Sequence, residues 1–533
     1  MDCKHRYIPY GSTGSFTTIV EDYLQGKDSL SGFYKYSPDA AGVKRAIADR
    51  AQFPVNRKVL VDTLQKQYRS IETDKAVTDN IASLANDNTF TVCTAHQPNL
   101  LTGYLYFIYK IVHAIKLADE LNEQHPDKHF VPVYYMGSED NDLEELGTFR
   151  YSGKKYTWDA AGQKGAFGRM DTKTLKSILD ELFRVLGPPN NETEQLKEVL
   201  TTAYLKHNNI SDATQYLADK LFGRYGLVVL NPDEAAFKNE ILNILEDDLL
   251  TQTPGKLVAN QAAKLSEYKT QAYPRDINLF YLQDQLRERI EKDDDVWKVL
   301  NTDIVWSKEE LLNELKQHPE RFSPNVILRG IFQETILPNI AFIGGGAEVA
   351  YWLQLKNIFE HYNVFYPAVL LRQSILWEEP GAKELQEKLG LTDEELFLPI
   401  DKLITDHITS TTTATLSTED EAERIEQVLT ELKQKATSLD KTLEASAEAA
   451  LAKMKYQLVV LEKKMLRAEK RNRATETERF HKLKNMLFPN GNLQERYENF
   501  MEYYTLYGSE FIDCLYACTD PLKNKFLIIS PNN

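Results

Sequence analysis

The chain has 533 residues, a net charge of −16 at pH 7 and the composition of an ordinary soluble globular protein. It is long enough for two to four domains and at least one large core. Its negative charge is spread along the sequence, and no segment resembles a membrane span or a signal peptide, so nucleic acid and membranes are disfavoured as partners.

Residues 1–89 are expected to be mainly helical. The sequence that follows them predicts a strand, a polar turn and a helix. Residues 90–93, Phe-Thr-Val-Cys, form a short and mostly apolar run with β-branched and aromatic residues, as in a buried strand. The polar turn 96–99 follows, and apolar residues then recur at helical spacing. A second apolar run covers 130–136. Strand, helix and strand in this order predict a right-handed βαβ unit in a parallel sheet.

The middle of the chain predicts inserted connecting segments at about 150–325, followed by a second strand, loop and helix. Within the insertions we expect a hairpin or loop at 150–170, amphipathic helix at 172–225, a strand at 226–230, and charged helices at 235–320 with a strand at 279–281. The second unit consists of a strand at 340–343, glycines at 344–346, a helix at 347–361 and a strand at 364–371.

The composition changes after residue 380, where glycine almost disappears and Ala, Glu, Lys and Leu dominate. Apolar residues from Ile425 to Leu443 follow the spacing of a coiled-coil seam, which slips near Ala450 and then resumes. A last strand is expected at 526–529. These features predict an α/β core at 1–375, a helical coiled-coil domain at 376–486 and a C-terminal segment at 487–533 that returns to the core.

The chain contains four cysteines, Cys3, Cys93, Cys514 and Cys518. They are too few for a disulfide framework, which indicates a reducing, cytoplasmic setting. Cys514 and Cys518 lie one helical turn apart without a second pair of ligands, so we expect packing residues rather than a metal or redox pair.

Polar side chains follow the first two predicted strands. In a site, His96 would stabilise a transferring phosphoryl or acyl group beside Lys110 as a fixed cation. Alternatively, His96 caps the helix and Lys110 is a solvated surface residue. Five carboxylates occur between residues 139 and 145. Helix capping explains some of them, and the others would hold a substrate ammonium or Mg²⁺ or accept a proton from an amine.

The glycines at 344–346 precede a helix and would allow close approach to an anion. They match neither the dinucleotide fingerprint nor the P-loop. Arg329 and Arg372, on either side of this loop in the sequence, would bind carboxylate or phosphate bidentately. Structural ion pairing is the competing interpretation of both arginines.

Five segments, in order over nearly the whole chain, resemble the bacillithiol biosynthesis cysteine-adding enzyme family. They are TAHQPNLLTGYLYFIYK, VPVYYMGSEDNDLEEL, NLFYLQDQLRERI, FSPNVILRGIFQETILPNIAFIGGGAEVAYWLQLK and LFPNGNLQERYENF. Two local departures stand out. The family turn often reads GQQPG where residues 95–99 read AHQPN, and the family glycine loop often reads GGPGE where residues 344–348 read GGGAE.

The resemblance implies a Rossmann-like core with inserted connecting segments and a coiled-coil domain that forms a homodimer. It implies a carbon–nitrogen ligase for the last step of bacillithiol biosynthesis, which joins the carboxyl group of cysteine to the amine of glucosaminyl-malate. Amide formation from a free carboxylate is uphill in water, so an acyl phosphate or acyl adenylate is expected. The family is associated with an adenine nucleotide near the coiled coil. ATP or ADP and Mg²⁺ are therefore candidate cofactors, and no tightly bound metal is expected.

Polar clusters and resemblance together predict the site. Catalytic roles are expected for His96, Gln97, Tyr106, Asp140 and Asp142. Substrate binding is expected for Asn99, Gly103, Lys110, Glu139, Arg329, Gly344, Gly345, Gly346, Glu348, Tyr351, Gln354, Arg372 and Ser374. Nucleotide binding is expected for Lys463, Lys464, Arg467, Asn490 and Arg496, which could equally form a solvated face.

Two other functions remain open at this stage. A different adenylate-forming nucleotidyl or aminoacyl transferase would exchange pyrophosphate with its own substrate and ignore glucosaminyl-malate. A non-catalytic coiled-coil interaction protein would leave the polar clusters at several strand ends without a purpose. Ligand-dependent thermal stability would separate a binding site from an inert core.

Overall fold

The computed structural model describes residues 1–269 and 271–532. The chain divides into two compact units, Met1–Glu378 together with Asn492–Asn533, and Glu379–Gly491. It therefore leaves the first unit after Glu378 and returns at Asn492. Among the described residues, no helix combines the length and the hydropathy that crossing a membrane requires.

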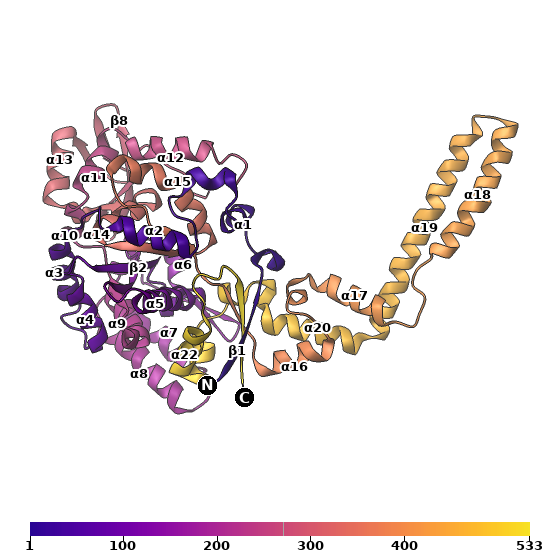
Figure 1. Ribbon diagram of the computed structural model, residues 1–533, viewed down its shortest axis with the longest axis horizontal. Helices are drawn as coiled ribbons and strands as arrows, with labels where there is room; N and C mark the ends of the chain where they lie inside the picture. Colours follow the sequence, from indigo (N-terminus) through magenta and orange to yellow (C-terminus); the bar gives the residue numbers. More distant parts are fainter. Residues whose placement is uncertain (270, 533) are drawn as a thin grey trace. The chain divides into compact units, whose positions relative to one another are not determined.

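A five-stranded parallel sheet with the strand order β13-β12-β2-β3-β6 forms the centre of the first unit, and its middle strand, β2, is labelled in Figure 1. The two predicted N-terminal strands are present as β2 and β3, joined through α5, so the predicted βαβ unit and parallel sheet are confirmed. The strands are β2 (Thr89–His96), β3 (His129–Met136), β6 (Val228–Leu230), β12 (Asn339–Gly344) and β13 (Ala368–Leu371).

The direction of winding reverses between β2 and β12. From β2 the chain moves outward to β3 and β6, returns to β12 on the other side of β2, and then moves outward to β13. Open α/β sheets bind ligands in the crevice beyond the carboxyl ends of their strands at such a point. The ends of β2 and β12, at His96 and Gly344, therefore mark where a site is expected.

One helix follows each of these two strands. α5 (Tyr106–Gln124) follows β2, and α15 (Gly346–Tyr362) follows β12. α5 is buried on most sides, as the density of apolar residues along it predicts. The hydrophobic core beside the sheet includes Val92, Phe130, Ile343, Ala114, Leu117 and Val43.

The other helices of the first unit confirm the helical predictions for 172–225 and for most of 1–89. They are α1 (Thr18–Leu24), α2 (Ala40–Arg50), α3 (Arg57–Gln67), α4 (Lys75–Ser83), α6 (Leu143–Leu146), α7 (Lys176–Phe183), α8 (Asn191–Lys206), α9 (Ile210–Phe222), α10 (Ala235–Asn239), α11 (Leu242–Leu250), α12 (Thr253–Ala263), α13 (Lys308–Gln317), α14 (Val326–Ile336), α21 (Met501–Tyr507) and α22 (Ser509–Cys518). The hairpin expected at 150–170 is present as β4 (Thr148–Tyr151) and β5 (Lys154–Thr157).

The helical prediction for 235–320 is wrong for residues 282–307, which form most of an antiparallel sheet, whereas the strand expected at 279–281 and a helix at 308–317 are present. The sheet has the order β10-β9-β8-β7-β11. Its strands are β7 (Leu279–Gln283), β8 (Leu286–Asp293), β9 (Val296–Val299), β10 (Val305–Ser307) and β11 (Phe322–Pro324). β8 is rich in Arg, Glu and Lys, which favour helices. Left-handed residues at the hairpin turns, Gln285 and Asp294, determine the strand pairing instead.

A small sheet joins the two ends of the chain and corrects two predictions. β15 (Phe526–Pro531), the predicted last strand, pairs with β1 (Cys3–Ile8) and with β14 (Ile375–Trp377). β1 is a strand inside the stretch expected to be mainly helical.

Cys514 of α22 forms a disulfide with Cys3, so it is not a simple packing residue, while Cys518 is free and buried. A separation of 511 residues hides this pairing from sequence patterns.

The side-chain amide of Gln494 links the two chain ends of the first unit between which the second unit is inserted. The Trp377 N–H donates to Gln494 Oε1 at 2.8 Å, and Gln494 Nε2 donates to the Trp377 carbonyl at 3.0 Å. Gln494 is buried and follows the return of the chain at residue 492. It therefore satisfies the end of β14 as a neighbouring strand would.

The second unit is helical, as predicted, and contains α16 (Pro380–Leu389), α17 (Ile400–Thr411), α18 (Glu419–Leu439), α19 (Leu443–Asn472) and α20 (Ala474–Leu487). α18 and α19 form a long hairpin (Figure 1). The expected continuous seam is wrong at Leu443, because the chain turns at 440–442 and Leu443 begins α19. The sequence predicted a slip of the coiled-coil spacing near Ala450. In the structure the break is a helical hairpin, and its second helix, α19, begins at Leu443, seven residues before Ala450.

Glu334 of α14 predicts a pH-dependent stability. It is buried, and its Oε1 accepts hydrogen bonds from Gln333 and Asn339. Burial raises the pKa of Glu334 to about 7. Between its ordinary pKa and 7 the folded state binds the extra proton, so the free energy of unfolding falls as pH rises through that window.

Glu334→Gln should reduce the loss of unfolding free energy between pH 5 and pH 7.5 by about 2 kcal/mol. Urea denaturation at the two pH values measures this difference. An unchanged pH dependence would mean that Glu334 titrates normally in the folded protein.

Candidate active site

A cavity of about 500 Å³ lies beyond the carboxyl ends of β2 and β12, at the reversal of the sheet. Residues from β2, α5, the loop after β3, α14, α15, the segment after β13 and the C-terminal segment line it. Phe280 and Arg287 of the antiparallel sheet also contribute. Seven regions, which extend from β2 to the C-terminal segment, therefore meet at this point, together with the inserted sheet.

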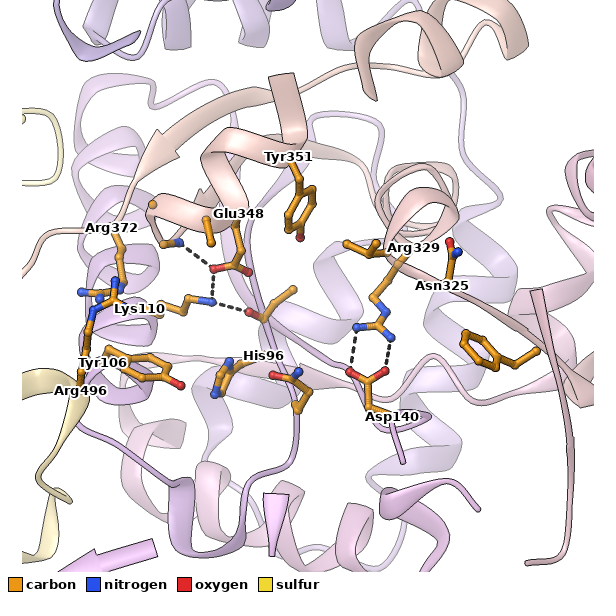
Figure 2. Close-up of a pocket in the computed structure, with 18 of the residues that line it drawn as sticks. His96, Tyr106, Lys110, Asp140, Asn325, Arg329, Glu348, Tyr351, Arg372 and Arg496 are labelled. Atoms are coloured by element: carbon orange, nitrogen blue, oxygen red, sulfur yellow. Dashed lines mark hydrogen bonds and ion pairs between the residues drawn. The ribbon is translucent and has the colours of Figure 1, made fainter. Parts of the chain in front are cut away.

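Lys110 is a buried member of the cavity wall, which excludes the solvated surface role. Its Nζ donates to the Ala95 carbonyl at 2.9 Å and forms an ion pair with Glu348 (Figure 2). Burial lowers the pKa of Lys110, while Glu348 acts in the opposite direction. The pair holds a positive and a negative group at the junction of α5 and α15.

His96 ends β2 and does not cap α5, whose N-cap is Leu105 without a side-chain hydrogen bond. The imidazole lies edge-on to the ring of Tyr106, 5.3 Å between centroids (Figure 2). Burial, followed by the charges of Lys110 and Arg372, lowers the pKa of His96 well below its ordinary value. Its buried Nε2 has no hydrogen-bond partner among the described residues. The site thus contains a neutral imidazole with one free nitrogen.

The predicted acid cluster separates into different environments. Asp140 lines the cavity, and its carboxylate accepts both Nη atoms of Arg329, at 2.6 and 3.1 Å (Figure 2). Arg287 Nη2 lies 3.5 Å from the same carboxylate. Burial raises the pKa of Asp140, but the two arginines outweigh this effect and hold it below the ordinary value. Asp140 is therefore ionised at neutral pH.

The other two predicted acids lie outside the cavity lining. Glu139 is buried and pairs with Lys238 of α10, while Ser323 Oγ donates to it at 3.1 Å. Asp142 is the exposed N-cap of α6 and accepts the Glu145 N–H at 3.0 Å. Capping, the structural interpretation, therefore accounts for Asp142, and an internal ion pair accounts for Glu139.

The glycine loop presents a carboxylate to the cavity. Gly345, Gly346, Glu348 and Tyr351 line the cavity. The Gly345 N–H, expected to face an anion, donates to Glu348 Oε2 at 2.7 Å. The loop therefore positions Glu348, which in turn holds Lys110.

Two arginines predicted to bind substrate are already ion-paired. Arg372 forms two hydrogen bonds with buried Glu495, at 2.7 and 2.8 Å, and its guanidinium lies 5.4 Å from the centroid of the Tyr106 ring. The Nη atoms of Arg372 are thus occupied by an internal ion pair with Glu495, as those of Arg329 are by Asp140. Arg496, in the next position after Glu495, lines the cavity and has no ion-pair partner within the described part of the chain.

The charge balance of the cavity is positive although the chain as a whole is acidic. Five cations line it against two carboxylates, which differ by three charges. Such a lining attracts anionic ligands and stabilises negative charge in a partly dry space. The cations are Lys110, Arg287, Arg329, Arg372 and Arg496, and the carboxylates are Asp140 and Glu348.

The remaining predicted residues lie elsewhere. Gln97 lines the cavity, whereas Asn99, Gly103, Gly344, Gln354 and Ser374 do not and are buried or within the backbone framework. Of the predicted nucleotide set, Arg496 lines the cavity, and Lys463, Lys464 and Arg467 are exposed on α19 of the second unit with Asn490 near its end.

Phe280, Arg287, Asn325 and Glu495 contribute to the site and were missed from the sequence, as were the lining residues Ala95, Gly137, Val326 and Ala347. Phe280 lies in the strand expected at 279–281, for which no site role was predicted, and Arg287 lies on β8, where a helix was expected. Glu495 and Asn325 lie in segments that match the family: Glu495 acts through its ion pair with Arg372, which only folding creates, and Asn325 is the N-cap of α14, where its side-chain oxygen accepts the Ile327 N–H at 2.8 Å.

Comparisons with known proteins agree with this arrangement. Residues 1–373 match the family model described as bacillithiol biosynthesis BshC, N-terminal Rossmann-like domain, and residues 375–531 match the BshC C-terminal coiled-coil domain. A protein of Flavobacterium psychrophilum named "Putative cysteine ligase BshC" is 41% identical over 525 residues, covering 98% of each chain. A protein of Salinibacter ruber with the same name is 30% identical and covers 96% of this chain and 95% of that protein.

Proposed function

This chain belongs to the bacillithiol biosynthesis BshC family, and we propose that its cavity joins the carboxyl group of cysteine to the amine of glucosaminyl-malate. The family establishes a cysteine ligase of bacillithiol biosynthesis with a Rossmann-like core and a coiled-coil domain. The acceptor amine, the activation of the carboxyl group and the residue roles are the proposal. One observation carries it above all: a cavity with surplus positive charge and a neutral imidazole at the reversal of the sheet.

The surplus charge supports an acceptor that carries carboxylates. Malate contributes two of them, and each would gain from a cationic partner in a space shielded from water. Arg496 has no ion-pair partner among the described residues, and Arg287 is only loosely paired, at 3.5 Å from Asp140. These two arginines would hold the malate carboxylates. Arg329 and Arg372 would keep Asp140 and Tyr106 in place.

The amine that attacks must be held and oriented. Asp140 is ionised and would accept a hydrogen bond from the amine. The free Nε2 of His96 would accept a second hydrogen bond and aim the nitrogen lone pair at the cysteine carbonyl. In this family a glutamine often occupies the position of His96. A glutamine oxygen also accepts a hydrogen bond but does not take up a proton, so the shared role is orientation.

His96→Gln should therefore retain kcat/KM within about tenfold, whereas His96→Leu should lose roughly 100-fold because it offers no polar atom. The low pKa of His96 also predicts that the wild-type rate shows no titration of this group above pH 6. Initial rates of amide formation for the three proteins measure both effects. Equal inactivity of the two variants would make His96 a proton acceptor.

Activation of the carboxyl group requires a coupled reaction, for which ATP with Mg²⁺ is the proposed source. The nucleotide would convert a poor leaving group into a phosphate or an adenylate. Three exposed cations within two turns of α19 suit the charge of a polyphosphate: Lys463, Lys464 and Arg467. Asn490 is the further contact proposed in the second unit. A thermal shift with ADP that is lost when the three cations become glutamates would support this assignment without relying on turnover.

The α18–α19 hairpin is proposed to pair with a second copy of the chain. Neither helix has a buried residue, and Leu432 and Met454 are about half exposed, at 49% and 47%. Such apolar helix faces ordinarily pack against a partner helix. Leu432→Glu with Met454→Glu should halve the mass measured by light scattering, while Glu431→Gln, a polar control, should not. A wild-type mass equal to one chain would contradict the pairing.

The function is tested by incubating the purified protein with cysteine and glucosaminyl-malate, with and without ATP and Mg²⁺, and detecting the amide by mass spectrometry. Product that requires ATP would support the complete proposal. Product without ATP would remove the nucleotide from the reaction. Pyrophosphate exchange with a different acid and no amide would favour another adenylate-forming transferase.

A further inference from the structure

The turn between β2 and α5 has an unusual backbone. Three consecutive residues, Leu101, Thr102 and Gly103, have positive φ values of 52°, 68° and 66°. Glycine adopts this region freely, but leucine and the β-branched threonine are disfavoured there. Both side chains are buried, at 0% and 2% exposure, so they cannot leave the turn without disturbing the core. The turn therefore depends on contacts that come from outside it.

Two regions supply such contacts: the Leu101 N–H donates to the Tyr204 hydroxyl of α8 at 2.9 Å, and the C-terminal segment, about 400 residues later in the chain, binds the carbonyls of the turn. Asn499 is fully buried, and its Nδ2 donates to the carbonyls of Leu101 at 2.8 Å and Gly103 at 2.6 Å. Its Oδ1 accepts the Met501 N–H at 3.0 Å. Both amide hydrogens thus hold the two ends of the left-handed turn, and the amide itself is fixed by α21.

The same segment also holds the start of α5. The Leu105 N–H, at the N-cap of α5, donates to the Glu498 carbonyl at 2.9 Å. The next residues of α5 carry Tyr106 and Lys110 into the cavity. Four residues before Asn499, Glu495 holds Arg372 behind Tyr106. The segment from Glu495 to Asn499 therefore holds both the start of α5, which carries Tyr106, and Arg372, which lies against the Tyr106 ring.

We propose that Asn499 is a positioning residue of the ligase: it holds the 101–103 turn in its left-handed form and thereby places Tyr106 and Lys110 for the reaction. This inference rests on the proposed function. Asn499 does not line the cavity, so it acts through α5. Displacing reacting groups by about 1 Å lowers a rate by up to about 100-fold while the binding contacts persist. The effect should therefore appear in kcat more than in KM.

The test compares Asn499→Ala with a matched variant, Asn190→Ala. Asn190 also uses its amide to bind a backbone carbonyl of the C-terminal segment, that of Thr505 at 2.8 Å, and it caps α8. It is not part of the cavity lining. Each variant loses one side-chain amide that links the C-terminal segment to another part of the first unit, so a general loss of packing around this segment would affect them alike.

We expect Asn499→Ala to lower kcat at least tenfold with KM within threefold of wild type, and Asn190→Ala to change neither by more than twofold. Adding Thr102→Gly to Asn499→Ala should recover part of kcat, because glycine holds a positive φ without support. Equal kcat values in the two single variants, or no recovery with glycine, would overturn the assignment.

Hydrogen exchange of the backbone keeps the inference separate from the proposed function. In Asn499→Ala, the Leu105 amide and its neighbours up to Lys110 should exchange at least tenfold faster, and in Asn190→Ala they should not. If the wild-type protein forms no amide, the proposed function fails, and this exchange then decides the role of Asn499. Unchanged protection at Leu105 in Asn499→Ala would overturn it.

Discussion

Asp140→Asn should lower kcat/KM by roughly 100- to 1,000-fold, which is the largest effect on activity that the site predicts. Asparagine has the shape of aspartate, but it removes the charge that Arg329 holds with two hydrogen bonds and that Arg287 faces at 3.5 Å. The buried guanidinium of Arg287 and the partly exposed guanidinium of Arg329 would then lose their carboxylate. The amine would also lose the acceptor that is proposed to orient it.

Asp142→Asn is the matched control for this prediction, because the same change occurs two residues later in the same acid cluster. Asp142 is exposed and caps α6 through the Glu145 N–H, and asparagine caps helices equally well. Its activity and thermal stability should match the wild type. Rates corrected for the folded fraction, obtained from circular dichroism, separate the two variants. Wild-type turnover in Asp140→Asn would remove Asp140 from the mechanism.

Lys238→Met should lower the free energy of unfolding by about 3–5 kcal/mol, since it leaves a carboxylate buried without its cation. Lys238 is 0% exposed and Glu139 is 5% exposed. The Lys238 ammonium also donates to the Phe322 carbonyl at 2.6 Å. The pair joins α10, the loop after β3 and β11, all beside the cavity but outside its lining.

The double variant Lys238→Met with Glu139→Gln tests whether the loss comes from the unpaired charge. Removing both charges should recover most of the stability, because well-packed neutral groups often replace a buried pair at little cost. Urea denaturation measures the three proteins. The double variant should also keep kcat/KM within a few-fold, since Glu139 does not face the cavity. A single variant within 1 kcal/mol of the wild type would contradict the energetic role of the pair.

The central fold could be predicted because its signals are local. The buried runs that became β2, β3 and β12 and the helical spacing of α5 and α15 agree with the structure within a few residues. Placing polar residues after those strands also located the region of the cavity, since carboxyl ends of parallel strands meet at one edge. Gln97, Tyr106, Lys110, Asp140, Arg329, Glu348, Tyr351 and Arg372 all line it.

The remaining features depend on partners that are distant in the sequence. β8 resembles a helix in composition, and only its pairing with β7 and β9 makes it a strand. Glu139 and Asp140 are adjacent, but opposite side-chain directions send one to Lys238 and the other to Arg329. The partner of Arg372 is Glu495, beyond an insertion of more than one hundred residues. No periodicity or spacing identifies such pairs.

The two hydrogen bonds between Trp377 and Gln494 make the helical unit an insertion between two neighbouring points of the first unit. The chain leaves and re-enters the first unit within hydrogen-bond distance of one residue pair, so a turn of a few residues would be long enough to replace the whole of Glu379–Gly491. Every described residue that lines the cavity belongs to the remaining part. The distance between the two chain ends at this junction therefore places no constraint on the length of the helical unit between them.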